Sequence, residues 1–202
     1  MTRHDVKKLD AYQACEGELR LIEVPASRFL AIDGAGDPNT EVFARAVEAL
    51  YPFAYTLKFA SKTELGQDYV VPPLEGLWWA EDLSVFTTRR DKSLWSWTLL
   101  LLVPAWVPDD LVVAAREKVR AKGAPERLDD VRLESLEEGL CVQTLHVGSF
   151  DDEGPVLERI HSEYLPAQGL RPTGKHHEIY LSDFRRVEPA RRRTILRQPV
   201  TR

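Results

Sequence analysis

The stretch GKHHEIYLSD, residues 174–183, combines side chains that often carry acid–base chemistry: two adjacent histidines, a glutamate and a tyrosine. We expect a β-strand here, and the side chains of a strand alternate between its two sides. Glu178 and Tyr180 would then point to one side with the first histidine, while the second histidine and Ile179 would point to the other. The side with Ile179 suits a core under a helix. The side with Glu178 suits either a concave site or solvent.

A metal site at these histidines is not expected. Adjacent side chains of a strand diverge, so His176 and His177 cannot easily bind one ion. The sequence contains no HxxxH, HExxH or clustered cysteine and histidine motif. Its two cysteines, Cys15 and Cys141, form neither a CxxC pair nor a disulfide framework. We therefore expect a protein that works without a metal or another cofactor.

Composition places the chain among ordinary soluble globular proteins. It has 202 residues, of which 44% are hydrophobic and 29% are charged, and its net charge is -5. A negative net charge argues against a nucleic-acid partner held by a positive field. The longest apolar run, residues 98–107, is too short for a membrane span and contains Pro104. The N-terminal segment lacks the apolar region of a secretory signal, so we expect a cytoplasmic protein.

Strands and helices alternate along the chain. The predicted strands are residues 19–32, 68–73, 76–84, 93–103, 139–148, 176–183 and 192–200, and the predicted helices are residues 41–58, 110–122 and 155–169. We expect Pro52 to end or kink the first helix, because proline lacks a backbone N–H. Gly123 is placed to close the second helix, and the charged stretch after it is interpreted as a link.

The second half of the chain resembles a copy of the first at an offset of 114 residues. Gly34 then meets Gly148, and apolar positions of the first helix such as Val42 meet those of the last helix such as Val156. Each half reads strand, helix, strand, strand, which predicts an α+β fold with an antiparallel sheet and helices on one face. Two amphipathic helices that each follow a strand can also share this register by chance.

Aromatic side chains are plentiful in the middle of the chain. Four tryptophans, Trp78, Trp79, Trp95 and Trp97, fall within twenty positions. Tryptophan-rich sheets more often form a core than a pocket, yet large rings also suit a flat apolar ligand. A carboxylate beside such rings would favour cationic or polarised ligands, because the rings and the acid both attract positive charge.

Three motifs together resemble the GyrI-like small-molecule-binding family: PLEGLWW (73–79), EEGLCVQTLHVGSFDDE (137–153) and GKHHEIYLSD. The resemblance covers about residues 17–200 and is strongest to stand-alone members without a DNA-binding domain. It implies a single domain over residues 1–202, built from two strand–helix–strand–strand modules related by a pseudo-twofold axis. Module one would span about 17–123 and module two about 137–200, with the ligand pocket between the modules.

The resemblance also implies a site. In multidrug-sensing members a glutamate on a late strand lies among aromatic residues, and Glu178 is at the matching position. Some stand-alone members resemble hydrolases that open cyclopropane rings of DNA-alkylating natural products, a detoxification role. By this hypothesis Glu178 is the general base, and Tyr69, Tyr55 or Tyr180 positions the water or the substrate carbonyl. The ligand-binding side chains would be those of Trp78, Trp79, Trp97, Tyr55, Glu75 and His176.

Several alternatives stay open from the sequence. Glu75 is either a turn residue before Gly76 or a second acid of the site, and His176 either lies on the surface or contacts Glu178 or the ligand. The protein is either the hydrolase, a non-catalytic binder of bulky aromatic or cationic compounds, or a gyrase-inhibitor-type module that binds protein. The partner expected for the first two is a small aromatic molecule, and we expect a monomer or a homodimer.

Overall fold

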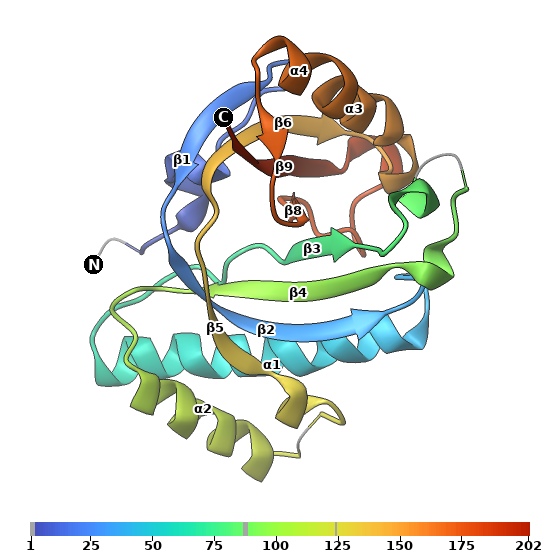
Figure 1. The fold of residues 1–202 in the computed structure, drawn as a ribbon. Helices are drawn as coiled ribbons and strands as arrows, with labels where there is room; N and C mark the ends of the chain where they lie inside the picture. Colours follow the sequence, from blue (N-terminus) through green and yellow to red (C-terminus); the bar gives the residue numbers. More distant parts are fainter. Residues whose placement is uncertain (1–2, 87–88, 124) are drawn as a thin grey trace. The chain divides into compact units, whose positions relative to one another are not determined.

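The computed structural model describes residues 3–86, 89–123 and 125–202, which form two compact units (Figure 1). The first unit holds the described residues up to Val6 together with Ser27–Pro72 and Ala80–Leu136. The second holds Lys7–Ala26, Pro73–Trp79 and Glu137–Arg202. Paired strands within each unit run antiparallel, so the predicted α+β class is confirmed. The division into two duplicated modules with the boundaries given above stays a prediction.

The first unit is a strand layer with two helices packed together. Its central strand β2 (Ser27–Ala35) pairs with β4 (Ser96–Val103) on one side and β5 (Arg132–Leu136) on the other. Helix α1 (Glu41–Glu64) packs on β2 and β4, and helix α2 (Asp109–Ala121) packs on α1 (Figure 1). The apolar side chains of these elements form a closed core.

Helix α1 does not end at Pro52, which corrects the expectation of a break there. The helix continues from Glu41 to Glu64 with Pro52 in its interior and exposed to solvent. A proline removes one helical hydrogen bond, but buried residues such as Leu50, Phe53 and Leu57 continue on both sides of it. Packing of this continuous apolar face outweighs the lost bond.

Two further predictions in this unit were wrong. The charged stretch after Gly123 is not only a link, because it contains strand β5, whose Arg132 pairs with Asp33 of β2 at 3.0 Å. Residues 68–73 do not form a strand, and Tyr69 makes only an isolated bridge with His4. The two prolines at the end of that segment have no backbone N–H to donate to a neighbouring strand, which explains why no strand forms there.

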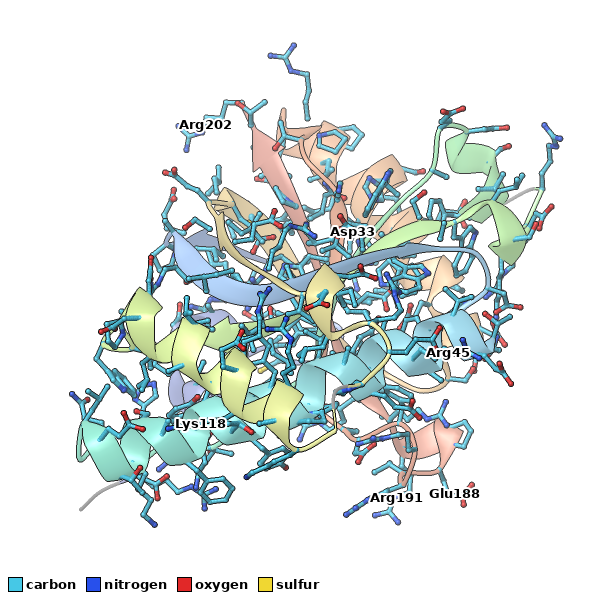
Figure 2. The ribbon with its side chains drawn as sticks, turned by 90° about the horizontal axis from the view of Figure 1, so that it is seen from below. Asp33, Arg45, Lys118, Glu188, Arg191 and Arg202 are labelled. Atoms are coloured by element: carbon cyan, nitrogen blue, oxygen red, sulfur yellow. The ribbon has the colours of Figure 1, made fainter. Side chains whose placement is uncertain are left out.

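Ion pairs connect charged side chains on the outer surface of this unit. Arg45 of α1 contacts Glu41 and Glu126, and Lys118 of α2 donates to Glu64 at 2.7 Å (Figure 2). These pairs are exposed, so each contributes little to stability.

The second unit contains the strands that carry GKHHEIYLSD. Its strand order is β1 (Arg20–Val24), β6 (Gly139–Val147), β9 (Arg193–Thr201), β8 (His176–Tyr180) and β3 (Glu75–Trp79), and β7 (Arg171–Pro172) pairs with the end of β9 (Figure 1). A helical segment follows β6 and consists of α3 (Gly154–Glu158), a π-helical turn η7 (Arg159–Tyr164) and α4 (Leu165–Ala167).

Short 3-10 turns complete the described structure. They are η1 (Val6–Lys8), η2 (Asp10–Tyr12), η3 (Leu83–Phe86), η4 (Lys92–Leu94), η5 (Leu128–Asp130), η6 (Phe150–Asp152) and η8 (Pro189–Arg191). No helix within the described ranges combines the length and the apolar character needed to cross a membrane.

The helical segment covers the side of the second sheet that carries Glu178, not the side that carries Ile179. Ile160 and Leu165 of this segment pack on Val142 of β6. The pairing register places Val142 on the same side as Leu196 of β9, which lies opposite Glu178. The expectation that the Ile179 side would lie under a helix was therefore wrong. That side is instead covered by the chain around residues 11–13.

Substitution of Gly34 tests the packing of β2 against β4 in the first unit. It lies opposite Trp97 in the β2–β4 pair, and a Cβ atom at this position would collide with the Trp97 ring. We expect Gly34→Ala to lower the free energy of unfolding by about 1–3 kcal/mol, because the buried ring has no space to move. Urea denaturation followed by circular dichroism measures this. Gly154→Ala, where the added Cβ meets open space, is the matched control and should change little.

Candidate functional site

Glu178 occupies the middle of a strand that is paired on both edges. Its backbone lies opposite Gly76 of β3 and Leu196 of β9. Hydrogen bonds on both edges hold the Cα atom rigidly, so the direction of the side chain is set by the sheet. The Glu178 side chain is 13% exposed, so it is nearly buried.

A chain of hydrogen bonds fixes the Glu178 carboxylate. The Tyr180 hydroxyl donates to Glu178 Oε2 at 2.8 Å, and Trp78 Nε1 donates to the Tyr180 hydroxyl oxygen at 3.0 Å. Gly76 makes room for this arrangement, since a Cβ there would lie 2.8 Å from Trp78 Nε1 and 2.9 Å from the Tyr180 hydroxyl. The lack of space for a larger side chain therefore explains why the PLEGLWW motif has a glycine at this position.

A second acid acts on Glu178. Glu153 lowers the pKa of the Glu178 carboxyl. Glu153 is 4% exposed and lies just before α3 in the chain.

His176 lies beside the same carboxylate. Its Nε2 is 3.7 Å from Glu178 Oε1, and neither ring nitrogen has a hydrogen-bond partner among the described residues. Burial, together with the positive charges of His161 and His177, lowers the pKa of His176 to about 3. The imidazole is therefore neutral at physiological pH and keeps one donor and one acceptor nitrogen for a ligand.

The carboxyl of Glu178 is poised near neutrality. Burial raises its pKa to about 7, although the hydrogen bonds of Tyr180 and Glu153 act in the opposite direction. A base with this pKa accepts protons efficiently near pH 7. Burial and the neighbouring Glu178 charge raise the pKa of Tyr180 well above its usual value, so the phenol keeps its proton.

Aromatic rings enclose the Tyr180 side of the carboxylate. The rings of Tyr180, Phe150 and Phe184 contact one another edge to face, with centroids 5.5 to 6.1 Å apart. The Arg192 guanidinium lies over the Phe150 ring at 5.3 Å. With Trp78, these rings supply apolar surface next to an acid.

The opposite side of β8 holds a different group of charges. His177 Nε2 lies 2.9 Å from Glu75 Oε2, and His177 Nδ1 lies 2.9 Å from Glu138 Oε1. Arg197 donates to Glu138 at 2.8 Å, and the Tyr12 hydroxyl donates to Glu75 at 2.6 Å. The His177 and Glu75 side chains are 0% and 1% exposed. Two carboxylates are thus matched by an imidazolium and a guanidinium, which makes this a closed structural network.

The charges of this network shift the pKa values of His177 and Glu138. Burial alone would lower the pKa of His177, but the carboxylates of Glu138 and Glu75 raise it to about 9. Burial would raise the pKa of Glu138, but His177 and Arg197 lower it to about 2. In the described part of the chain, no cluster of three or more acidic, histidine or cysteine side chains is arranged to hold a metal ion.

The model of the GyrI-like small molecule binding domain matches residues 17–200. The chain belongs to this family. Comparison with curated protein sequences gives no match.

Solved structures agree with this assignment. An uncharacterized conserved protein from Listeria innocua is 40% identical, with a TM-score of 0.87 over 98% of this chain and 100% of that one. A hydrolase from Listeria innocua is 38% identical, with a TM-score of 0.87 over 99% of this chain and 100% of that one. The EcmrR C-terminal domain shares the fold alone, with 10% identity and a TM-score of 0.56 over 92% of this chain and 98% of that one.

The structure brings together four of the residues that the sequence indicated for the GyrI-like site. They are Glu178, Tyr180, Trp78 and His176. Glu75 is neither in a turn nor next to Glu178, because it begins β3 and belongs to the His177 network. Trp79 is partly exposed and its ring contacts Lys175.

Three of the indicated residues belong to the other unit of the GyrI-like chain, and their roles in ligand binding stay predictions. Trp97 is 0% exposed and donates to the Gly36 carbonyl at 3.2 Å. Tyr69 is buried and packs edge to face on Trp106, and burial raises its pKa. Tyr55 is 49% exposed on α1.

Sequence reasoning missed Glu153, Phe150 and Phe184. The first two lie in the motif that ends SFDDE. A phenylalanine beside a run of acidic residues was the available signal. Phe184 follows the last strand motif directly, and nothing in its spacing indicated a contact with Tyr180.

The His177 network predicts a pH-dependent stability. The pKa of His177 is raised from 6.5 to about 9 on folding, so its contribution is complete below pH 6.5 and is lost as the pH rises through 9. We expect the free energy of unfolding to fall between pH 6.5 and 9, by at most about 1.4 kcal/mol per pH unit for this one proton. Urea denaturation across this range measures the slope.

His177→Gln should remove that slope. His161→Gln is the control and should keep the slope, because burial lowers the pKa of His161, and a pKa lowered on folding makes stability rise and not fall with pH. A wild-type stability that stays level from pH 6.5 to 9 would contradict the imidazolium assignment.

Proposed function

We propose that this GyrI-like protein binds strained or electrophilic aromatic compounds and hydrolyses them, with Glu178 as the general base. One observation carries the proposal: a nearly buried carboxylate, poised near neutral pH, is held by Tyr180, whose ring contacts those of Phe150 and Phe184. Such a group combines proton affinity with an apolar binding surface.

The reaction that suits this site is the opening of a cyclopropane ring conjugated to a carbonyl. Glu178 removes a proton from a water molecule as the water oxygen forms a bond to a ring carbon. The strained carbon–carbon bond breaks, and its electron pair moves to the carbonyl oxygen. The proton held by Glu178 then passes to the product through solvent, so that one water is added in total. Relief of ring strain supplies much of the driving force.

Neighbouring side chains have separate roles in this proposal. Tyr180 holds the base, because its hydroxyl already donates to Glu178. His176 is neutral, so its free ring N–H can donate to the substrate oxygen as negative charge develops there. Trp78 and the rings of Phe150 and Phe184 would contact the planar body of the substrate. Tyr69, Tyr55, Trp79 and Trp97 stay candidates for the remaining contacts.

The relatives support hydrolysis. A protein from Listeria innocua that is 38% identical over nearly the whole chain is a hydrolase, and a second structure of a hydrolase from that organism is 37% identical. Similarity at this level over the full length makes a shared reaction class a reasonable inference.

Binding without turnover is the second candidate, and the same carboxylate favours it. Glu178 is held by Tyr180, whose ring contacts the rings of Phe150 and Phe184, and an acid combined with aromatic rings attracts planar organic cations. A pure binder would hold such a cation without adding water to an electrophile.

Glu178→Gln tests the proposed chemistry. We expect kcat for hydrolysis of a cyclopropane-containing dienone to fall by about 10²–10⁴-fold, because an amide cannot take the proton from water. Mass spectrometry that follows the addition of water measures the rate. The exposed Glu188, before η8 (Figure 2), gives the matched control Glu188→Gln, which makes the same charge change and should leave the rate unaltered.

Binding of a rhodamine-type dye separates the two candidates. Fluorescence polarisation measures ligand binding, and we expect Glu178→Gln to keep its affinity for a neutral aromatic ligand. The same variant should lose turnover in the mass-spectrometry assay. A wild-type protein that binds the dye tightly but adds water to none of a panel of electrophiles is a binder and not a hydrolase. Unchanged turnover in a folded Glu178→Gln protein would exclude Glu178 as the base.

A further inference from the structure

The outer face of helix α1 exposes aromatic side chains to solvent. Tyr55 is 49% exposed and Phe59 is 55% exposed. The ring of Tyr51 lies beside that of Tyr55, with centroids 6.3 Å apart, and Pro52 next to it is exposed as well. A single exposed apolar residue needs no explanation, whereas several large rings together on one helix are typical of a surface that contacts another molecule.

The exposed residues of this face are spaced like those of a contact between two helices. Glu48, Pro52, Tyr55, Phe59 and Lys62 are all exposed, and they follow one another at intervals of four, three, four and three positions. This is the 3.5-residue period at which one helix packs along another. We call these five residues the α1 seam.

Helix α2 packs on a different flank of α1 and leaves the seam open (Figure 2). The Arg116 guanidinium of α2 lies 5.5 Å from the centroid of the Phe53 ring, and Lys118 donates to Glu64 at 2.7 Å. At 3.6 residues per turn, Phe53 and Glu64 lie about half a turn around the helix from Tyr55. A second helix therefore has access to the seam.

Opposite charges lie at the two ends of the α1 seam, each seven positions from Tyr55. Glu48 is exposed and has no ion-pair partner among the described residues. Lys62 is 55% exposed at its side chain and lies 3.4 Å from Asp68, which Lys58 already contacts at 3.0 Å. In an antiparallel pair of α1 helices with a two-fold axis at Tyr55, Glu48 would face the partner's Lys62, and symmetry would repeat this pair.

We propose that the α1 seam is a dimerisation surface, on which a second copy of this chain packs its own α1 in the antiparallel direction. Tyr55 lies at the two-fold axis, and Phe59 packs near the partner's Pro52. A parallel arrangement would place like charges together, so the end charges select the antiparallel one. With one helix from each copy, we expect the contact to bury less than the about 1,200–2,000 Å² of a standard interface and to dissociate in the micromolar range.

Tyr55→Glu tests the surface. It places two acids against each other at the centre of the contact, so we expect dimerisation to weaken by about 30-fold or more. Sedimentation equilibrium measures this as the concentration at which the mass rises from 23.0 kDa towards twice that value. Val113→Glu is the matched control, because Val113 is 63% exposed on α2 and lies outside the seam. A wild type that stays monomeric up to millimolar concentration overturns the proposal.

Charge reversal tests the antiparallel direction. Glu48→Lys places two lysines opposite each other and should weaken dimerisation by about 10-fold, since the changed contact occurs twice per dimer. The double variant Glu48→Lys with Lys62→Glu should regain the wild-type dissociation constant, because the pair is restored with its signs exchanged. Circular dichroism shows that each variant is folded. A folded double variant that dimerises no better than Glu48→Lys overturns the proposed register.

The ligand role predicted for Tyr55 gives a different result. If Tyr55 contacts the ligand instead, Tyr55→Glu should alter binding of a rhodamine-type dye while dimerisation stays at the wild-type level, and this outcome overturns the seam. The proposal does not depend on hydrolysis. A dimer without turnover rejects the enzyme and keeps the seam, whereas turnover by a protein that is monomeric at every concentration keeps the enzyme and rejects the seam.

Discussion

The arrangement of the second unit depends on one desolvated carboxylate. A glutamate taken out of water is costly unless donors replace its hydration. Tyr180 supplies a donor at 2.8 Å, Trp78 in turn holds Tyr180, and Gly76 leaves the space that both need. Each of these residues is explained by the charge at Glu178, and none of them by packing of an apolar core alone.

Strand β8 separates two electrostatic environments that differ in balance. On one side, the carboxylates of Glu75 and Glu138 are matched by His177 and Arg197, and their buried atoms contact one another at 2.8 to 2.9 Å. On the other side, Glu178 accepts a hydrogen bond from Tyr180 and has a neutral His176 beside it. A matched network stabilises a fixed geometry, whereas a buried carboxyl with a raised pKa responds to protons. The first side supports the strand, and the second carries the acid that we propose as the base.

The helical segment after β6 contributes to both the core and the reactive side. Its Ile160 and Leu165 pack on the sheet, and Glu153 precedes it directly. The π-helical turn Arg159–Tyr164 includes His161, whose charge acts on His176. Turns of this kind are frequent at functional sites, because the wider turn changes where side chains point.

The sequence by itself determined the elements and the family. The alternation of side chains in HHEIY placed Glu178 and Tyr180 on one side of a strand. The helix over residues 41–58 and the strand over residues 139–148 could be predicted because their hydrophobic periodicity is visible within the segment itself. Local signals failed where packing decided the outcome. Pro52 stays inside α1 because the buried face of the helix continues past it, and β5 forms in a charged stretch because β2 offers a free edge and Asp33 pairs with Arg132.

Only the tertiary structure decided what surrounds the acid. Glu75 was a candidate for a second acid of the site, yet adjacent strands place Glu75 and Glu178 on opposite sides of the sheet, one matched by His177 and the other hydrogen-bonded to Tyr180. Glu153 is 25 positions before Glu178, and nothing in that spacing indicates that it acts on the pKa of Glu178. A pKa depends on burial and on neighbours that come from distant segments. The sequence therefore determined which acid to examine, and the fold decided that it is the one able to accept a proton near pH 7.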